Sequence, residues 1–361
     1  MFIAIIILII AYLAVYLRFA PVAGSDPTKE EVNRFSVHEN FRLGKFQNAV
    51  PTRLSVPLSA LVPLLKFNLL SREKAPSEPI EVPPFDLAKW VSIRHDQFGL
   101  IWFGHSSLML KVNGKTILID PVFSKRASMF RLIGPHRFPM TDPVRPEDLP
   151  DIDILLITHD HYDHLDYFAL KKMRSKVGEV VTTLGVRSHF RRWGWDMERL
   201  RECGWGDEIM IDGIRMVCCP ARHFSGRRID NRMSTLWSSW VIHGGNTNLY
   251  HGADSGYHPG FQQIGEKYGP FDLATLECGA YSPYWPEIHM LPEETIQAGV
   301  DLNAKVVMPI HWGKFALGPH PWNEPPQRAE AKAKELEIPL FIPRIQEVNE
   351  FQGPYISDWW R

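Results

Sequence analysis

The stretch DIDILLITHDHYDHLDY, residues 151–167, joins an apolar run to a cluster of histidines and aspartates. Residues 152–157 are apolar except for Asp153, and a short run of this kind is typical of a β-strand buried on both faces. His159 and His161 follow directly, two residues apart, so an extended backbone points both imidazoles to the same side. The stretch therefore predicts a buried strand that ends in metal-binding side chains.

Asp163 and His164 come next, where the chain is expected to turn into a helix that begins near Leu165. Imidazole and carboxylate donors without a thiolate suit Zn²⁺, with Mn²⁺ or Fe as alternatives. One tetrahedral ion cannot easily use all four donors of so short a turn, whereas two ions that share the turn can. We therefore expect a pair of metal ions.

Three further candidate ligands follow other apolar segments. His223 comes after IRMVCCPAR, Asp254 after NLYHGA and His311 after AKVVMPI. Each of them taken singly has an ordinary explanation, such as a capped turn or a buried polar group that is hydrogen-bonded. Four sites of this type at the ends of apolar segments are not expected by chance, and an aspartate between two cations can bridge them.

The remainder of residues 96–361 predicts a mixed α/β domain. Hairpin turns are expected at Asn113-Gly114, at Asp212-Gly213 and between Gly244 and Thr247. Further strands are expected within 271–281 and 304–315, and helices at 165–173, 292–302 and 326–337. Hairpins come first and alternating strands and helices follow, which indicates two sheets packed face to face with helices outside.

The N-terminus predicts a membrane anchor. Residues 1–17, MFIAIIILIIAYLAVYL, carry no charge and would span about 26 Å as a helix, close to the hydrocarbon thickness of a bilayer. No basic residue precedes the run and no clear cleavage site follows it, so a retained single-pass transmembrane anchor over residues 1–23 is favoured over a cleaved signal peptide. The positive-inside rule then predicts a cytoplasmic catalytic domain, since these basic residues follow the run: Arg18, Lys29, Arg34, Arg42 and Lys45.

Residues 24–95 are predicted to form a Pro-rich linker with a partly apolar, membrane-proximal segment. That segment is LSVPLSALVPLLKFNLL, residues 54–70, in which Pro57 and Pro63 prevent a long uninterrupted helix. Two alternatives are open for it: packing on the core, or a hydrophobic lip that lies on the membrane near a lipid site.

Composition excludes several other classes of protein. Apolar residues make up 45% of the 361 residues, and the net charge is −1 without a long basic run, which argues against a nucleic-acid partner. The four cysteines are sparse and form no CxxC zinc motif, so reduced, buried thiols are expected. The oligomeric state is left open, with a dimer as one alternative.

The sequence HDHYDH matches the HxHxDH motif of the metallo-β-lactamase superfamily, and the later His, Asp and His follow in the order of that superfamily. WFGHSSLMLKVNGKTILIDPVFSKRAS, IGEKYGPFDLATLECGAYSP and IHWGKFAL, within roughly residues 95 to 345, resemble its branch of phospholipases D that hydrolyse N-acyl-phosphatidylethanolamine. The resemblance implies an αββα sandwich with two zinc ions at one edge. Carried over by position, it assigns His159, His161 and His223 to one zinc, Asp163, His164 and His311 to the other, and Asp254 to both.

The resemblance also suggests residues beyond the seven ligands. His289, in PEIHMLPEET, aligns with a histidine near the family's active site and is a catalytic candidate together with Asp163. It would contact the phosphate or protonate the leaving group, and the alternative is a surface-loop histidine. His105, in FGHSS, and Asp120, in LIDP, are candidates to support the ligands from behind. A purely structural role is the alternative for both and is favoured for Asp120.

The function that the resemblance implies is dizinc hydrolysis of a phospholipid phosphodiester, most specifically of N-acyl-phosphatidylethanolamine to N-acylethanolamine and phosphatidic acid. The expected partners are thus a phospholipid and a membrane. A lactonase or another phosphodiesterase of the same fold is the alternative enzyme. A non-enzymatic scaffold with a vestigial site is disfavoured because the ligand set is complete.

Overall fold

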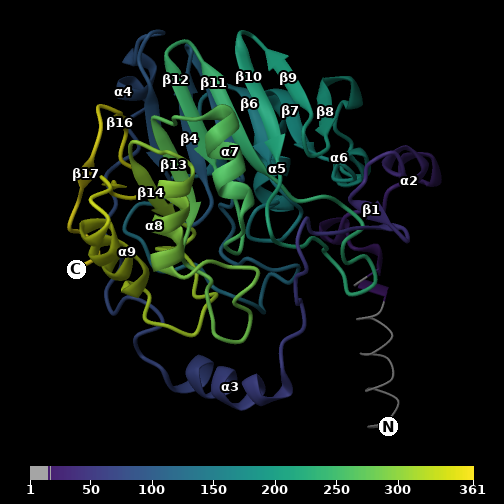
Figure 1. Ribbon diagram of the computed structural model, residues 1–361, viewed down its shortest axis with the longest axis horizontal. Coiled ribbons are helices and arrows are strands. Elements are labelled where there is room, and N and C mark those ends of the chain that lie inside the picture. Colours follow the sequence, from purple (N-terminus) through teal and green to yellow (C-terminus); the bar gives the residue numbers. More distant parts are fainter. Residues whose placement is uncertain (1–14, 17) are drawn as a thin grey trace.

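The computed structural model describes residues 15–16 and 18–361, in which two β-sheets pack face to face with helices outside (Figure 1). The first sheet has the strand order β16 (Asn349–Glu350), β3 (Gly99–Trp102), β4 (Leu108–Val112), β5 (Lys115–Ile119), β6 (Ile152–Ile157), β7 (Val177–Thr183) and β8 (Leu200–Cys203). The second has the order β14 (Val307–Ile310), β13 (Leu273–Glu277), β12 (Thr247–His251), β11 (Ser239–Gly244), β10 (Ile214–Cys219) and β9 (Glu208–Ile211). The predicted mixed α/β sandwich is confirmed.

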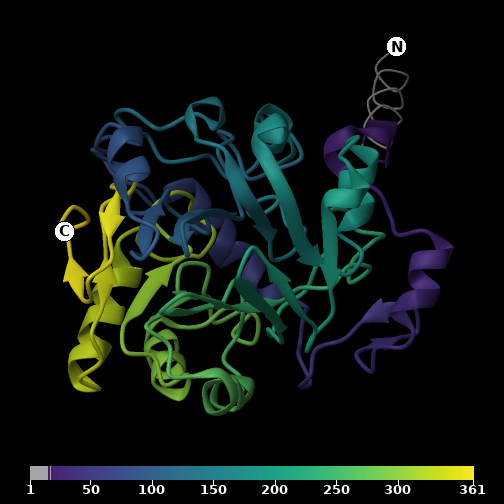
Figure 2. The same cartoon turned by 90° about the horizontal axis from the view of Figure 1, so that it is seen from above.

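Helices cover the outer faces of both sheets. Behind the first sheet lie α4 (Leu87–Ser92), α5 (Tyr167–Met173) and α6 (Arg187–Arg192), and against the second lie α7 (Gly260–Tyr268), α8 (Pro292–Asp301) and α9 (Glu324–Glu335). Figure 2 shows the same layers from above, with the N-terminal elements in purple at one end and the C-terminal strands in yellow at the other. Short 3-10 helices occupy Pro21–Ala23, Leu58–Ala60, Pro146–Asp148, Arg174–Lys176 and Met197–Arg199, and β15 (Phe341–Ile342) pairs with β17 (Tyr355–Ile356).

The apolar run of β6 is continuous because this strand is buried on both faces. Ile154 and Leu156 lie in the core between the two sheets. Leu155 and Ile157, on the opposite face, pack in a second apolar cluster together with Leu170 of α5. β6 pairs in parallel with β5 on one side and β7 on the other. A central parallel strand of this kind is covered on both faces, so consecutive side chains are apolar.

The three predicted hairpin turns are confirmed. Asn113 and Asp212 adopt positive φ angles of 50° and 49°, as the first residue of a tight turn between antiparallel strands requires. These turns join β4 to β5 and β9 to β10, and the third joins β11 to β12. In the second sheet β10, β12 and β14 consequently run in the same direction, so their C-terminal ends lie at one edge.

Residues 24–95, predicted as a linker, carry elements of their own. Phe35, at the end of α2 (Lys29–Phe35), and Phe46, in the hairpin of β1 (Phe41–Arg42) and β2 (Lys45–Phe46), pack against Trp237 and Leu236. In contrast, α3 (Leu61–Leu70) has no buried residue, and Leu61, for example, is 66% exposed. The alternative in which this apolar segment packs on the core does not hold for α3. The four cysteines are free and buried, as predicted.

The prediction of a single-pass anchor with a cytoplasmic catalytic domain is contradicted. Among residues 15–16 and 18–361, no helix is both long and apolar enough to cross a membrane. The end of the predicted span is instead a 3-10 helix at Pro21–Ala23, where Val22 and Ala23 are buried against Met129. Residues 1–14 and 17 of the predicted anchor lie outside the described residues.

Candidate metal centre

The seven predicted ligands lie together at the edge where the ligand-bearing strands end. His159, His161, Asp163 and His164 follow β6 of the first sheet, and the others follow strands of the second sheet. His223 follows β10, Asp254 follows β12 and His311 follows β14. Because these strands end at one side of the sandwich, residues far apart in the sequence come within contact distance.

Three imidazoles form the first group. The Nε2 atom of His159 lies 3.0 Å from Nδ1 of His161, and Nε2 of His223 lies 3.2 Å from the same Nδ1. The Asp254 carboxylate completes the group, with Oδ2 at 3.5 Å from Nε2 of His223 and 3.8 Å from Nε2 of His159. The four side chains place their donor atoms within the reach of one cation.

The second group contains Asp163, His164 and His311, and His105 joins it. The Nε2 atoms of His164 and His311 are 3.2 Å apart. Oδ2 of Asp163 lies 3.5 Å from Nε2 of His311 and 3.8 Å from Nε2 of His164. Nε2 of His105 is hydrogen-bonded to the same Asp163 oxygen at 2.9 Å. This group too can hold a cation.

Asp254 lies between the two groups. Besides its contacts with the first group, its Oδ2 is 3.2 Å from Nε2 of His164 and its Oδ1 is 3.0 Å from Nε2 of His311. The side chain is buried, and Oδ1 accepts no hydrogen bond of good geometry from the described residues. A buried carboxylate oxygen without a hydrogen bond requires a compensating positive charge. The arrangement therefore fits a carboxylate that bridges two cations.

In two of the imidazoles, the ring nitrogen that points away from the cluster makes a hydrogen bond. The other ring nitrogen, which points into the cluster, is then available to a metal ion. Nδ1 of His164 donates to Oδ2 of Asp120 at 2.8 Å, and Nδ1 of His223 donates to the Ile288 carbonyl at 3.0 Å. In its neutral form each ring turns an unprotonated Nε2 inwards. Burial would lower the pKa of His164, but Asp254, Asp163 and Asp120 outweigh it and raise this pKa well above its usual value, so a metal ion would take the place of the Nε2 proton of His164. Lone pairs that face one another at about 3 Å repel, and a cation between them removes the repulsion.

The pKa shifts of the side chains in the two groups also show that a positive charge between these side chains is favourable. Burial alone would raise the pKa of Asp254, but His164 and His311 outweigh it and hold this pKa well below its usual range. Burial would lower the pKa of His311, yet Asp254 and Asp163 raise it to about 9. Burial lowers the pKa of His159 and His223 well below the usual value, so those two rings are neutral and suited to bind metal.

His289 lies at the edge of the same site. Its Nδ1 is 3.1 Å from Oε1 of Glu277, and its ring centroid is 5.0 Å from that of His223. It forms a third potential metal-binding group with Asp254 and His311. The side chain is only 11% exposed and is hydrogen-bonded to a buried glutamate, so it is not a free surface-loop histidine.

Asp120 is more closely tied to the site than the sequence suggested. Its carboxylate accepts hydrogen bonds from the Thr158 amide at 2.9 Å and the Thr158 hydroxyl at 2.6 Å, in addition to the one from His164. Asp120 is thus placed to fix the orientation of the His164 ring, and its role in metal binding stays a prediction. His105 contacts Asp163 through a hydrogen bond, and its supporting role also stays a prediction.

Sequence reasoning missed three residues that hold the ligands in place. Asp160 accepts hydrogen bonds from the Gly226 amide, the Thr235 hydroxyl and His189, which ties the loop after β6 to residues 226–235. The Asn48 side chain binds both backbone groups of His223, and Glu277 holds His289. Only Asp160 had a signal, because it lies inside the HDHYDH motif.

Replacement of Asp120 tests the orienting role. We expect Asp120→Asn to lower metal affinity by roughly 10-fold to 100-fold, since residues that orient metal ligands contribute effects of this size. Metal affinity is measured by competition with a chromogenic chelator. Asp358→Asn is the matched control, because Asp358 is 70% exposed and its carboxylate pairs with Arg361. Equal affinities in the two variants would contradict the role of Asp120.

Comparison with known proteins identifies the family. The sequence profile of the beta-lactamase superfamily domain matches residues 115–312, which include all seven predicted ligands. The chain belongs to the beta-lactamase superfamily. Among the relatives, an uncharacterized protein of Mycobacterium tuberculosis is 38% identical over 331 residues, which cover 89% of this chain and 87% of the relative.

Other similarities agree on a metal-dependent hydrolase fold. The N-acyl-phosphatidylethanolamine-hydrolyzing phospholipase D 1 of Caenorhabditis elegans is 34% identical over 238 residues, 62% of this chain and 67% of the relative. A metallo hydrolase structure from Ignicoccus hospitalis superposes with a TM-score of 0.55 at 23% identity, over 71% of this chain and all of that one. This superfamily member thus has a metallo-hydrolase fold with His and Asp clusters that can bind metal ions.

Proposed function

We propose that the protein is a two-metal phosphodiesterase that hydrolyses N-acyl-phosphatidylethanolamine to N-acylethanolamine and phosphatidic acid. The observation that carries the proposal is the buried Asp254 carboxylate, which lies between two groups of imidazoles at 3.0–3.8 Å. The substrate is supported by the similarity to the nematode phospholipase.

The proposed ligands divide as the two groups do. His159, His161 and His223 would hold one ion, Asp163, His164 and His311 would hold the other, and Asp254 would contact both. Zn²⁺ is proposed because the donors are imidazoles and carboxylates, and Mn²⁺ or Fe are the alternatives. Two such cations supply the charge that makes a water molecule acidic and that stabilises charge on the phosphate oxygens.

The residues around the ions position the reacting groups. Asp163 is held by His105 and carries its carboxylate toward His164 and His311 of the second group. Glu277 fixes the His289 ring through Nδ1, which leaves Nε2 for the substrate. When both ring nitrogens carry a proton, His289 is therefore placed to donate a hydrogen bond to a phosphate oxygen, or to donate the Nε2 proton to the departing alkoxide oxygen of the N-acylethanolamine.

The neighbourhood of the site supports a lipid substrate. The segment before α3 is connected to the site through two neighbouring residues, Glu287 and Ile288. The Arg53 amide donates a hydrogen bond to Oε2 of Glu287 at 2.6 Å, and the carbonyl of Ile288 accepts a hydrogen bond from His223. The helix that follows exposes Leu65 and Leu69, at 55% and 70%. An exposed apolar helix connected to the site is suited to contact acyl chains.

Direct hydrolysis tests the proposal. Purified protein is incubated with acyl-labelled N-acyl-phosphatidylethanolamine, and we expect release of N-acylethanolamine that a chelator abolishes and added Zn²⁺ restores. Release that is insensitive to chelation would contradict the metal mechanism. Cleavage of lactones in a parallel panel, without release from the phospholipid, would reject this substrate in favour of the lactonase alternative.

A further inference from the structure

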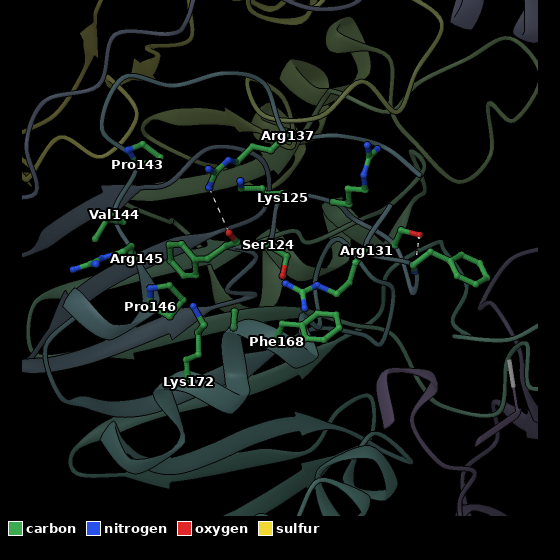
Figure 3. Close-up of a pocket in the computed structure, with 15 residues that line it drawn as sticks. Ser124, Lys125, Arg131, Arg137, Pro143, Val144, Arg145, Pro146, Phe168 and Lys172 are labelled. Carbon is green, nitrogen blue, oxygen red and sulfur yellow. Dashed lines mark hydrogen bonds between the residues drawn. The ribbon is translucent and has the colours of Figure 1, made fainter. Parts of the chain in front are cut away.

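A second cavity lies apart from the metal centre, on the side of α5. It has a volume of about 390 Å³ and is bounded by the loop from Phe123 to Arg131, by Arg137, by residues 143–146 and by the face of α5 that carries Phe168 and Lys172. Figure 3 shows these side chains around one hollow. None of the seven proposed metal ligands lines it, so its chemistry is separate from that of the metal centre.

The lining is strongly basic. Six cationic side chains border the cavity, and two of them are neutralised: Lys172 pairs with Glu147 at 2.9 Å and Arg145 with Asp148 at 2.8 Å. Within residues 15–16 and 18–361, the other four form no ion pair with a carboxylate; they are Lys125, Arg126, Arg131 and Arg137. In a chain with a net charge of −1, four unpaired cations around one cavity form a site of positive potential.

The loop that carries these cations is held in shape. The Arg137 amide donates to the Lys125 carbonyl at 2.9 Å, and its guanidinium donates to the Phe123 carbonyl at 3.4 Å. Arg126 donates to the Gly134 carbonyl at 2.6 Å. The Asp166 carboxylate accepts from the Phe123 and Ser124 amides. The Arg126 and Arg137 side chains are therefore positioned before any ligand arrives, which lowers the entropic cost of binding.

Part of the cavity lining is apolar. Phe168 and Phe130 line it together with Val144, and the Arg131 guanidinium lies 5.5 Å from the centre of the Phe168 ring (Figure 3). This contact places the planar guanidinium against the Phe168 ring. A ligand that used the whole cavity would thus carry an anionic end and an organic part.

We propose that this cavity binds the phosphate group of an organic phosphomonoester. Several cations favour a ligand with more than one negative charge over a single carboxylate, and guanidinium groups match the tetrahedral oxygens of phosphate with paired hydrogen bonds. The apolar side chains of the lining, Phe130, Val144 and Phe168, accommodate the organic part. The binding site is additional to the proposed hydrolytic function and does not depend on it.

Calorimetry tests the site with defined probes. Phenyl phosphate and inorganic phosphate are titrated into the metal-loaded protein and into the variant Lys125→Gln/Arg131→Gln. Both side chains are exposed, so the variant is expected to fold normally. We expect phenyl phosphate to bind more tightly than inorganic phosphate, and the variant to bind phenyl phosphate about 10-fold more weakly or worse, with less binding at high salt.

Two control variants separate the site from other causes. Lys29→Gln/Arg34→Gln removes two exposed cations of α2 without an ion pair in the described structure, and phosphate binding should be unchanged. Asp254→Asn alters the metal centre and should retain binding in the cavity. The proposal is overturned by an absence of binding, by equal weakening in the two double variants, or by binding that only Asp254→Asn removes.

Vesicles distinguish the two sources of such a ligand. Phosphatidylcholine vesicles with and without phosphatidic acid are sedimented with the wild type and with Lys125→Gln/Arg131→Gln. Sedimentation that needs both phosphatidic acid and the two cations would assign the phosphate to a lipid headgroup. Binding of phenyl phosphate without sedimentation would assign it to a soluble phosphoester. Each result supports the site and defines its ligand.

Discussion

Asp254→Asn is expected to reduce hydrolysis on the order of a thousandfold and to lower the bound metal from about two ions per chain to one or fewer. The carboxylate faces imidazoles of both groups, at 3.2 Å from His164 and 3.0 Å from His311. An amide keeps the shape but has no negative charge, and loss of one buried charged partner costs about 3–5 kcal/mol. Metal content is measured by elemental analysis and activity by product release.

The control for this variant is again Asp358→Asn, which makes the same chemical change at an exposed carboxylate. It should keep full activity and metal content. If Asp254→Asn retained two metal ions and normal turnover, Asp254 would not bridge them. A folded Asp254→Asn protein, shown by an unchanged circular dichroism spectrum, excludes unfolding as the cause of a loss.

Gly279→Ala is expected to lower activity about 100-fold because it displaces His311, and misplacement of a reacting group by about 1 Å has effects of this size. A Cβ atom at Gly279 would lie 1.9 Å from the His311 carbonyl oxygen and 2.5 Å from its carbonyl carbon. These are backbone atoms, and the amide of His311 is fixed by its hydrogen bond to the His105 carbonyl. We also expect about 1–3 kcal/mol of destabilisation, measured by denaturant unfolding.

A glycine without a close neighbour provides the comparison. Gly206 has a φ of 93°, and a methyl group added to its Cα would have nothing within 4 Å. Gly206→Ala therefore strains the backbone and costs about 1–2 kcal/mol without touching the site. It should lose stability and retain turnover. Equal activity losses in Gly206→Ala and Gly279→Ala would show that destabilisation alone is responsible.

The local sequence pattern was sufficient to predict the parts of the fold that depend on short-range preferences. The apolar run of β6 predicted a strand buried on both faces. Asn113-Gly114 and Asp212-Gly213 predicted tight turns, because these residue types readily adopt the positive φ angles that such turns require. The ligand set followed from the same logic, since each candidate came directly after an apolar strand. The structure brings these residues together at one edge.

Long-range contacts explain what the sequence could not predict. Asp120 orients His164 from 44 positions away, and Asn48 holds the His223 backbone from 175 positions away, so neither role has a local signature. The basic cavity forms only when the loop after β5 meets α5. Pro21–Ala23 were assigned to the predicted anchor because the sequence there is apolar. In the structure Val22 and Ala23 are buried in a cluster with Met129, a long-range contact that the local sequence does not reveal.

Anomalous diffraction from crystals of the metal-loaded protein, recorded at the zinc absorption edge, tests the central claim most directly. Two peaks are predicted, one between His159, His161 and His223 and one between Asp163, His164 and His311, with the Asp254 carboxylate in contact with both. A single peak, or a pair of peaks that Asp254 does not join, would contradict the two-metal centre.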